Sequence, residues 1–204
     1  MVAMSNFGDL VRTSIEEKID IIFSGAGLPL DLPEYLTEGC KTKLVPIVSS
    51  GRGARLIAKV WKEKYNYLPD GFVVEGPKAG GHLGFKVEQL TDSKFALENL
   101  VVDVLAESQQ LEADYHKKIP VIAGGGIFTG EDIYKIMRLG ADGVQMGTRF
   151  VATDECDASQ EFKQTFIDAQ EEDIEIIKSP VGMPGRAIRN QFTLDVKEGI
   201  KKPF

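Results

Sequence analysis

Five short apolar runs recur along the chain, and amphipathic stretches separate them. The runs are rich in Ile and Val on both faces and do not alternate with polar residues, which is typical of strands in a parallel sheet covered on both sides. They span residues 19–27, 43–50, 71–76, 119–126 and 143–148. This alternation of strand and helix predicts an α/β fold.

Three of the intervening stretches have the spacing of amphipathic helices. We expect helices from about residue 53 to 65 and from about 95 to 107. The inward side of the first should carry Leu56, Ile57, Val60 and Trp61. A further helix should follow Thr129, whose hydroxyl can cap it, and should end at Gly140. Its inner face should carry Ile133, Ile136 and Met137.

Composition and charge narrow the class of protein. With 204 residues, 43% hydrophobic and 27% charged, the chain has the composition of a soluble globular domain. The net charge of -7 gives no general attraction to nucleic acid or to an anionic membrane. No signal peptide opens the sequence, and no apolar run approaches the roughly 20 residues that span a bilayer. We therefore expect a cytoplasmic protein with no nucleic-acid or membrane partner.

The two cysteines, Cys40 and Cys156, lie far apart in the sequence. Neither belongs to a Cys-x-x-Cys pair or has a histidine at metal-ligand spacing. We expect free thiols and no metal site.

Every apolar run has small residues at its carboxyl end. They are Ser24-Gly25, Ser49-Ser50, Gly76, Gly124-Gly125-Gly126 and Gly147-Thr148. In parallel α/β folds the ligand binds at the carboxyl ends of the strands, where small residues let it approach the backbone. The last two tips correspond to the loops that form the phosphate site of many (β/α) barrels. Together they predict a phosphate-binding site.

Other nucleotide and catalytic motifs are absent. The stretch 124–130 lacks the Gly-x-Gly-x-x-Gly spacing, and no acid ends a strand about 20 residues later. The sequence also contains no P-loop and no Gly-x-Ser-x-Gly elbow. The chemistry must therefore come from other residues.

The two histidines differ in their surroundings. His116 lies in the polar segment 114–118 and is expected at the surface. His82 follows Gly80-Gly81 on the loop after the third run, at the expected ligand end. An imidazole can accept a proton near pH 7, so His82 is the candidate catalytic base.

Three segments resemble the nitronate monooxygenase family, formerly called 2-nitropropane dioxygenases: residues 73–84, 120–127 and 140–150. The likeness runs from about Val2 to near Phe192 in the family's order and spacing, and it includes residues 23–27 and 179–186. The resemblance implies a (β/α)8 TIM barrel that holds FMN. It also implies oxidation of an alkyl nitronate by dioxygen to a carbonyl compound and nitrite.

The resemblance also assigns roles to individual residues. His82 matches the catalytic base. Glu75, which is commonly Gln in the family, and Gly80 match flavin-contacting positions. Gly125 and Gly126 match the phosphate turn after the seventh strand. The stretch that ends the eighth strand is matched by Gln145, Met146, Gly147 and Thr148.

The resemblance implies an incomplete barrel, with about strands 3 to 8 in residues 1–192 and a tail in residues 193–204. The first two βα units, with a Gly-Gly-Met tip that contacts the flavin ring, have no counterpart, and relatives continue beyond the far end. A barrel that lacks strands has unpaired edges. We expect such edges to allow self-association or to bind a partner that completes the barrel.

Three alternatives stay open. A flavin-dependent enoyl-acyl-carrier-protein reductase shares the Gly-Gly-His loop and the phosphate turns but takes hydride from NAD(P)H. A catalytically silent fragment would use its edges only for association. Inosine-monophosphate dehydrogenases share Ala141-Asp142-Gly143 and the glycine turn, but neither Cys40 nor Cys156 matches their catalytic cysteine.

Overall fold

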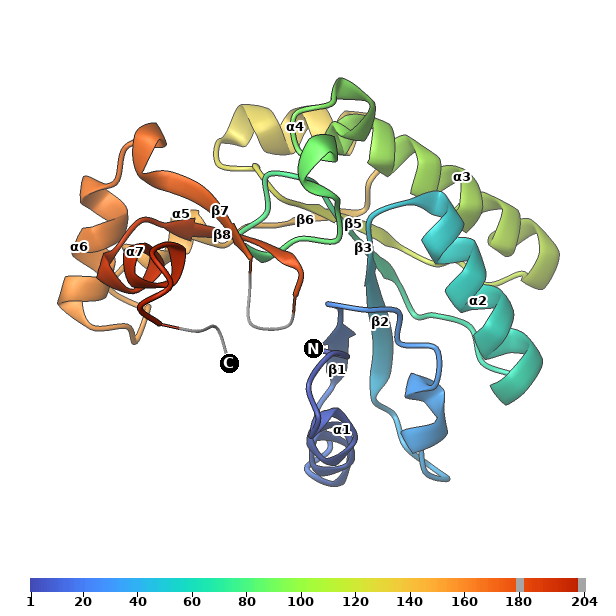
Figure 1. Ribbon diagram of the computed structural model, residues 1–204. Coiled ribbons are helices and arrows are strands. Elements are labelled where there is room, and N and C mark those ends of the chain that lie inside the picture. The colour runs from blue at the N-terminus through green and yellow to red at the C-terminus, as the bar shows by residue number, and fades with distance from the viewer. Residues whose placement is uncertain (179–181, 202–204) are drawn as a thin grey trace.

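The computed structural model describes residues 1–178 and 182–201. Each of the five apolar runs forms one strand of a parallel sheet, and the strands lie side by side in chain order (Figure 1). They are β1 (Ile21–Ser24), β2 (Lys43–Val48), β3 (Phe72–Glu75), β5 (Val121–Gly124) and β6 (Gly143–Gln145). The predicted α/β fold is confirmed.

The chain-order arrangement of the strands is that of consecutive units of a (β/α) barrel, so the predicted incomplete barrel is confirmed. Strands 3 to 8 would provide six parallel strands, whereas the described residues form five. The residues before β1 form turns and the helix α1 (Phe7–Glu16). All five strands point the same way, so their carboxyl ends meet at one edge of the sheet.

Helices α2 (Gly51–Tyr65), α3 (Leu97–Tyr115) and α4 (Gly130–Arg138) run along one face of the sheet (Figure 1). Thr129 accepts a hydrogen bond from the N–H of Asp132, which confirms the predicted cap of α4. Helix α3 continues eight residues past the expected end at residue 107, because Ser108 and Leu111 still pack inward. It ends at Tyr115, and the residue that follows it, His116, is exposed, as predicted.

The hydrophobic core lies between this face of the sheet and the helices. Ile57 and Trp61 of α2 are fully buried, but Leu56 is 40% exposed, contrary to our expectation. Helical geometry explains the difference, because the buried stripe repeats every three or four residues and Leu56 falls about 100° from its neighbour Ile57. Met137 of α4 is 41% exposed for the same reason, since Ile136 occupies the inward position.

The other face of the sheet carries the alternate residues of each strand. On this face Val45 and Val73 are buried in the centre of the sheet, whereas Ile21 and Phe23 of β1 are 43% and 51% exposed. Strand β1 pairs only with β2, so its other edge is unpaired among the described residues. The apolar inner face of the incomplete barrel is therefore open at this side.

A second, antiparallel sheet was not predicted. It contains β4 (Gly81–His82), β8 (Pro184–Ile188) and β7 (Ile174–Lys178), in that order. The segment with His82, which we expected to be a loop, forms strand β4. It pairs with residues of β8 more than 100 positions later in the chain. Residues 179–181 of the family-like segment 179–186 lie outside the described residues.

The carboxyl-terminal region contains three further helices. They are α5 (Thr148–Val151), α6 (Gln160–Asp168) and α7 (Gln191–Lys197). Short 3-10 turns occupy Leu32–Tyr35, Val87–Gln89, Ser93–Phe95 and Glu171–Asp173. Helix α7 crosses the predicted boundary between residues 192 and 193 and buries Thr193. The division into barrel and tail stays a prediction. Across the two described ranges, no helix has both the length and the apolar character of a membrane span.

Candidate functional site

The cofactor-binding residues predicted from the sequence lie together at the carboxyl ends of the parallel strands. All of them line one cavity of about 470 Å³. They are Glu75, Gly80, Gly125, Gly126, Gln145, Met146, Gly147 and Thr148. The volume is within the range of roughly 300–1,000 Å³ that is usual for small-molecule sites. The fold thus brings three separate segments of the chain to one place.

The glycine turn after β5 forms a wall of this cavity and has no room for side chains. Gly125 has φ +101°, and a Cβ atom there would lie 2.9 Å from the carbonyl oxygen of Gly76. Gly126 has φ +91°, and its Cβ would lie 3.0 Å from Cβ of Lys78. Backbone with positive φ is accessible to glycine and strained for other residues. The turn can therefore present bare backbone to a ligand.

A row of three residues crosses the sheet at the base of the cavity. Glu75 is in register with Gly124, and Gly124 is in register with Gln145. Gly124 has no side chain, so the two polar side chains flank a patch of backbone. This row ends β3, β5 and β6 and positions a carboxyl group and an amide on one face.

Glu75 also lines a second cavity, of about 230 Å³, which it shares with His82, Ser49 and Met183. The carboxyl group thus belongs to the glycine-lined cavity on one side and to the histidine cavity on the other. Desolvation by burial raises the pKa of Glu75 to about 7. At neutral pH a large share of the Glu75 side chains is therefore uncharged.

His82 is held in the histidine cavity by the antiparallel sheet. It is in register with Gly185 of β8, and the N–H of Leu83 donates to the carbonyl of Pro184 at 2.8 Å. Its Nε2 atom is buried and has no hydrogen-bond partner among the described residues. A buried polar atom without a partner costs about 1–3 kcal/mol, so a ligand that bonds to Nε2 would remove this cost.

Arg186 of β8 fixes the loop that precedes His82. Its guanidinium group donates to the carbonyl of Pro77 at 2.9 Å and to the carbonyl of Ala79 at 3.1 Å. Burial lowers the pKa of Arg186 from its ordinary value. A half-buried cation bonded to two backbone carbonyls restrains the path of the loop, and therefore the position of His82.

Sequence reasoning assigned no role to Arg186 or to Lys78, which also lines the glycine-lined cavity. Lys78 could have been recognised, because it is the basic residue of the glycine-rich loop that was already predicted to lie at the ligand end and to carry His82. Arg186 could not, because its acceptors lie 107 and 109 residues earlier in the chain.

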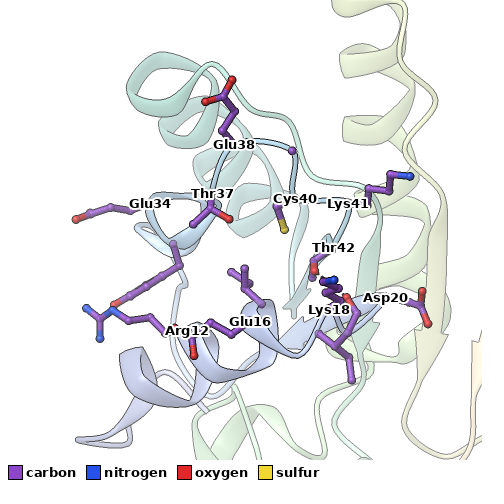
Figure 2. Close-up of a pocket in the computed structure, with 14 residues that line it drawn as sticks. Arg12, Glu16, Lys18, Asp20, Glu34, Thr37, Glu38, Cys40, Lys41 and Thr42 are labelled. Carbon is purple, nitrogen blue, oxygen red and sulfur yellow. Dashed lines mark hydrogen bonds between the residues drawn. The ribbon is translucent and has the colours of Figure 1, made fainter.

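A larger groove, of about 810 Å³, lies at the opposite end of the sheet (Figure 2). Figure 2 shows Arg12 and Glu16 of α1 across it from Thr37 and Cys40. Its walls carry charges of both signs and none of the predicted site residues. Cys40 and Cys156 are free thiols. Within residues 1–178 and 182–201, no cluster of three His, Cys, Asp or Glu side chains could hold a metal.

Comparison with known proteins gives one consistent family. The nitronate monooxygenase family profile matches residues 3–203. A probable nitronate monooxygenase of Staphylococcus saprophyticus is 28% identical over 97% of this chain and 52% of its own length. A probable nitronate monooxygenase of Staphylococcus aureus strain Newman is 32% identical over 92% of this chain and 49% of its own length. The chain therefore spans about half the length of these curated relatives.

Solved structures agree on the fold. The structure of FabK from Thermotoga maritima is 31% identical, with a TM-score of 0.73 over 96% of this chain and 54% of that chain. Nitroalkane oxidase from Streptomyces ansochromogenes has a TM-score of 0.69 over 95% of this chain and 52% of that chain. At 23% sequence identity it supports the fold alone.

Proposed function

The chain belongs to the nitronate monooxygenase family, and on that premise we propose that it is an FMN-dependent oxidoreductase that converts alkyl nitronates and dioxygen to a carbonyl compound and nitrite. The observation that carries this proposal is the meeting of the glycine-lined cavity with His82 at the same edge of the sheet. The family makes an oxidoreductase the expected class of enzyme.

The residues of the site fit a flavin mononucleotide in three respects. The cavity has a suitable volume of about 470 Å³. The turn at Gly125 and Gly126 presents backbone, and Lys78 adds a positive charge beside it, as a phosphate requires. Glu75 and Gln145 offer polar groups on either side of bare backbone. We therefore assign the glycine turn, Gly147 and Thr148 to the phosphate, and Glu75, Gly80, Gln145 and Met146 to the flavin.

In this proposal the FMN, when bound, supplies the electron acceptor. His82 supplies the base. Its Nε2 would take the proton from the carbon next to the nitro group of a neutral nitroalkane and so form the nitronate, which the lack of a hydrogen-bond partner at that atom favours. Arg186 keeps the imidazole in place by holding the loop at Pro77 and Ala79.

The test is a visible absorption spectrum of the purified chain after FMN is added and the free cofactor is removed by desalting. Retained flavin bands, followed by nitrite release from a nitronate under air, would support the proposal. A folded protein that stays colourless would contradict flavin binding by this chain and would favour a catalytically silent fragment.

A second candidate is an enoyl-acyl-carrier-protein reductase that takes hydride from NAD(P)H. It is favoured by the likeness to FabK, an enoyl-acyl-carrier-protein reductase. The sequence identity to FabK is 31%, whereas the identity to nitroalkane oxidase is 23%. NADH oxidation that depends on an enoyl thioester, without nitrite release from nitronates, would select this alternative.

We further propose self-association through the open side of the sheet. Strand β1 has an unpaired edge among the described residues, and its Ile21 and Phe23 side chains are 43% and 51% exposed. Unpaired edges beside exposed apolar side chains favour contact with another chain. Phe23→Lys should shift the chain toward monomer in sedimentation experiments, and an unchanged mass would contradict the proposal.

A further inference from the structure

Glu75 occupies a position that no other charged residue of the site shares. It is the last residue of β3 and lines both the glycine-lined cavity and the histidine cavity. Its neighbour in register, Gly124, has no side chain, so nothing from that strand covers the carboxyl group on the sheet face. A ligand that fills either cavity would therefore contact Glu75.

We propose that Glu75 binds the flavin as a neutral carboxylic acid, so that the chain takes up a proton when FMN enters the site. This inference rests on the proposed function, because it requires FMN to be the ligand of the glycine-lined cavity. It would make the affinity of the chain for FMN dependent on pH, which is a form of regulation of the proposed function.

The difference between the two forms of the carboxyl group explains the proposal. A neutral acid has an O–H that can donate a hydrogen bond to the ligand, whereas a carboxylate can only accept. An ionised carboxylate also loses its hydration when an aromatic ring covers it, and this loss is costly in an apolar site. Burial already raises the pKa of Glu75 to about 7 in the free chain.

The other charged groups that face the two cavities do not offset this effect. Among the described residues that line them, only Lys78 and His82 carry titratable side chains. Neither forms a hydrogen bond or an ion pair with Glu75, and desolvation is the one cause of the raised pKa. Covering the carboxyl group with the flavin should therefore raise the pKa of Glu75 further.

The sign of the pH dependence follows from proton linkage. Because the complex holds its proton more tightly than the free chain, FMN affinity is highest below pH 7 and falls as the pH rises through the free-chain pKa of Glu75. The fall should reach up to about tenfold per pH unit, and near pH 7.5 binding should take up about three quarters of a proton. Glu75→Gln carries an amide that donates at every pH, so its affinity should lack this decline.

The experiment is isothermal titration calorimetry of FMN into the whole chain at pH 7.5, in two buffers that differ in ionisation enthalpy. The difference in heat gives the number of protons taken up. Wild type, Glu75→Gln and the exposed control Glu88→Gln are compared, and circular dichroism verifies that each is folded. Protons bound by the FMN phosphate, whose second pKa is about 6, contribute equally to all three proteins.

We expect wild type and Glu88→Gln to take up about three quarters of a proton more than Glu75→Gln. Equal proton numbers in all three proteins, with FMN bound, would overturn the inference while leaving the flavin proposal intact. Folded protein that binds no FMN at either pH 6 or pH 7.5 would overturn both. A variant Glu75→Gln that loses FMN binding at pH 6, where wild type binds, would show that the carboxyl group acts in another way and would also overturn the inference.

Discussion

The two ends of the parallel sheet differ in whether their buried polar side chains have hydrogen-bond or ion-pair partners. At the amino ends, polar side chains join neighbouring strands: Asp70 accepts from the N–H of Leu44 at 3.0 Å, and Asp142 accepts from the N–H of Val121 at 3.0 Å. At the carboxyl ends, His82 Nε2 is buried without a partner among the described residues, and Glu75 is desolvated without a counter-charge. The contrast agrees with a stabilising role of the first end and with the ligand-binding role that we propose for the second.

The comparison also shows that cavity size alone does not identify a site. The groove at the amino ends is larger, at about 810 Å³ against about 470 Å³. Its Thr42 hydroxyl already donates to the carbonyl of Ile19, and its Arg12 already pairs with Asp9. Unsatisfied groups, together with backbone that tolerates no side chain, distinguish the carboxyl end. Four substitutions test this contrast, in order of decreasing effect.

His82→Ala should have the largest effect. Removal of a positioned base lowers turnover by roughly 10²-fold or more, while FMN binding persists because the glycine-lined cavity is untouched. Steady-state nitrite release from a neutral nitroalkane and the flavin spectrum measure the two properties separately. The exposed residue His116 provides the control, and His116→Ala should change neither. Unchanged turnover in His82→Ala would remove this residue from the mechanism.

Gly125→Ala should weaken FMN binding by about tenfold or more, because strain of this kind costs about 1–3 kcal/mol. The new Cβ would lie 2.9 Å from the carbonyl oxygen of Gly76, at φ +101°. Gly130→Ala is the matched control, since a Cβ there meets nothing within 4 Å. Fluorescence titration with FMN compares the two, and equal affinities would argue against the phosphate role of the turn.

Arg186→Gln should lower turnover by about tenfold with little change in KM, because small displacements of a catalytic group slow the chemical step. Hydrogen exchange at residues 77–83 should become faster, since two hydrogen bonds to the loop are lost. Arg186→Lys should restore part of the rate. The control Arg189→Gln removes an exposed ion pair with Asp173 on the same hairpin. Loss of activity without faster exchange would contradict a positioning role.

Asp70→Asn should affect stability and not the site. Burial alone would raise the pKa of Asp70, but hydrogen bonds from Tyr67, the N–H of Leu44 and Lys117 outweigh it and lower the pKa below its ordinary value. We expect a loss of about 1–3 kcal/mol in the free energy of unfolding. Because the folded-state pKa is lowered, this contribution is present above pH 4 or so and is lost as the pH falls through the folded pKa.

Urea unfolding of Asp70→Asn at pH 7 and near pH 3 measures this effect, with the exposed Asp9→Asn as control. The difference from wild type should shrink at the lower pH. An undiminished difference would mean that the charge of Asp70 is not the source of stability. A loss of FMN affinity larger than the loss of folded protein would contradict the separation of the two ends.

Local patterns were sufficient for much of this architecture. Each of the five apolar runs forms a strand, and helix α4 lies between Thr129 and Gly140 as predicted. Both predictions succeeded because periodicity and capping act within a few residues. The glycines after β5 adopt the positive φ angles that favour glycine. The gathering of the predicted cofactor residues follows from parallel strands, whose carboxyl ends share one edge. Their functional roles stay predictions.

The tertiary structure alone decided three features. The pairing of His82 with Gly185 and the hold of Arg186 on the loop join segments more than 100 residues apart, which no local pattern specifies. The shared place of Glu75 in two cavities depends on what packs around β3. Its pKa of about 7 has the same origin, because desolvation is set by the atoms that exclude water and not by the residue type.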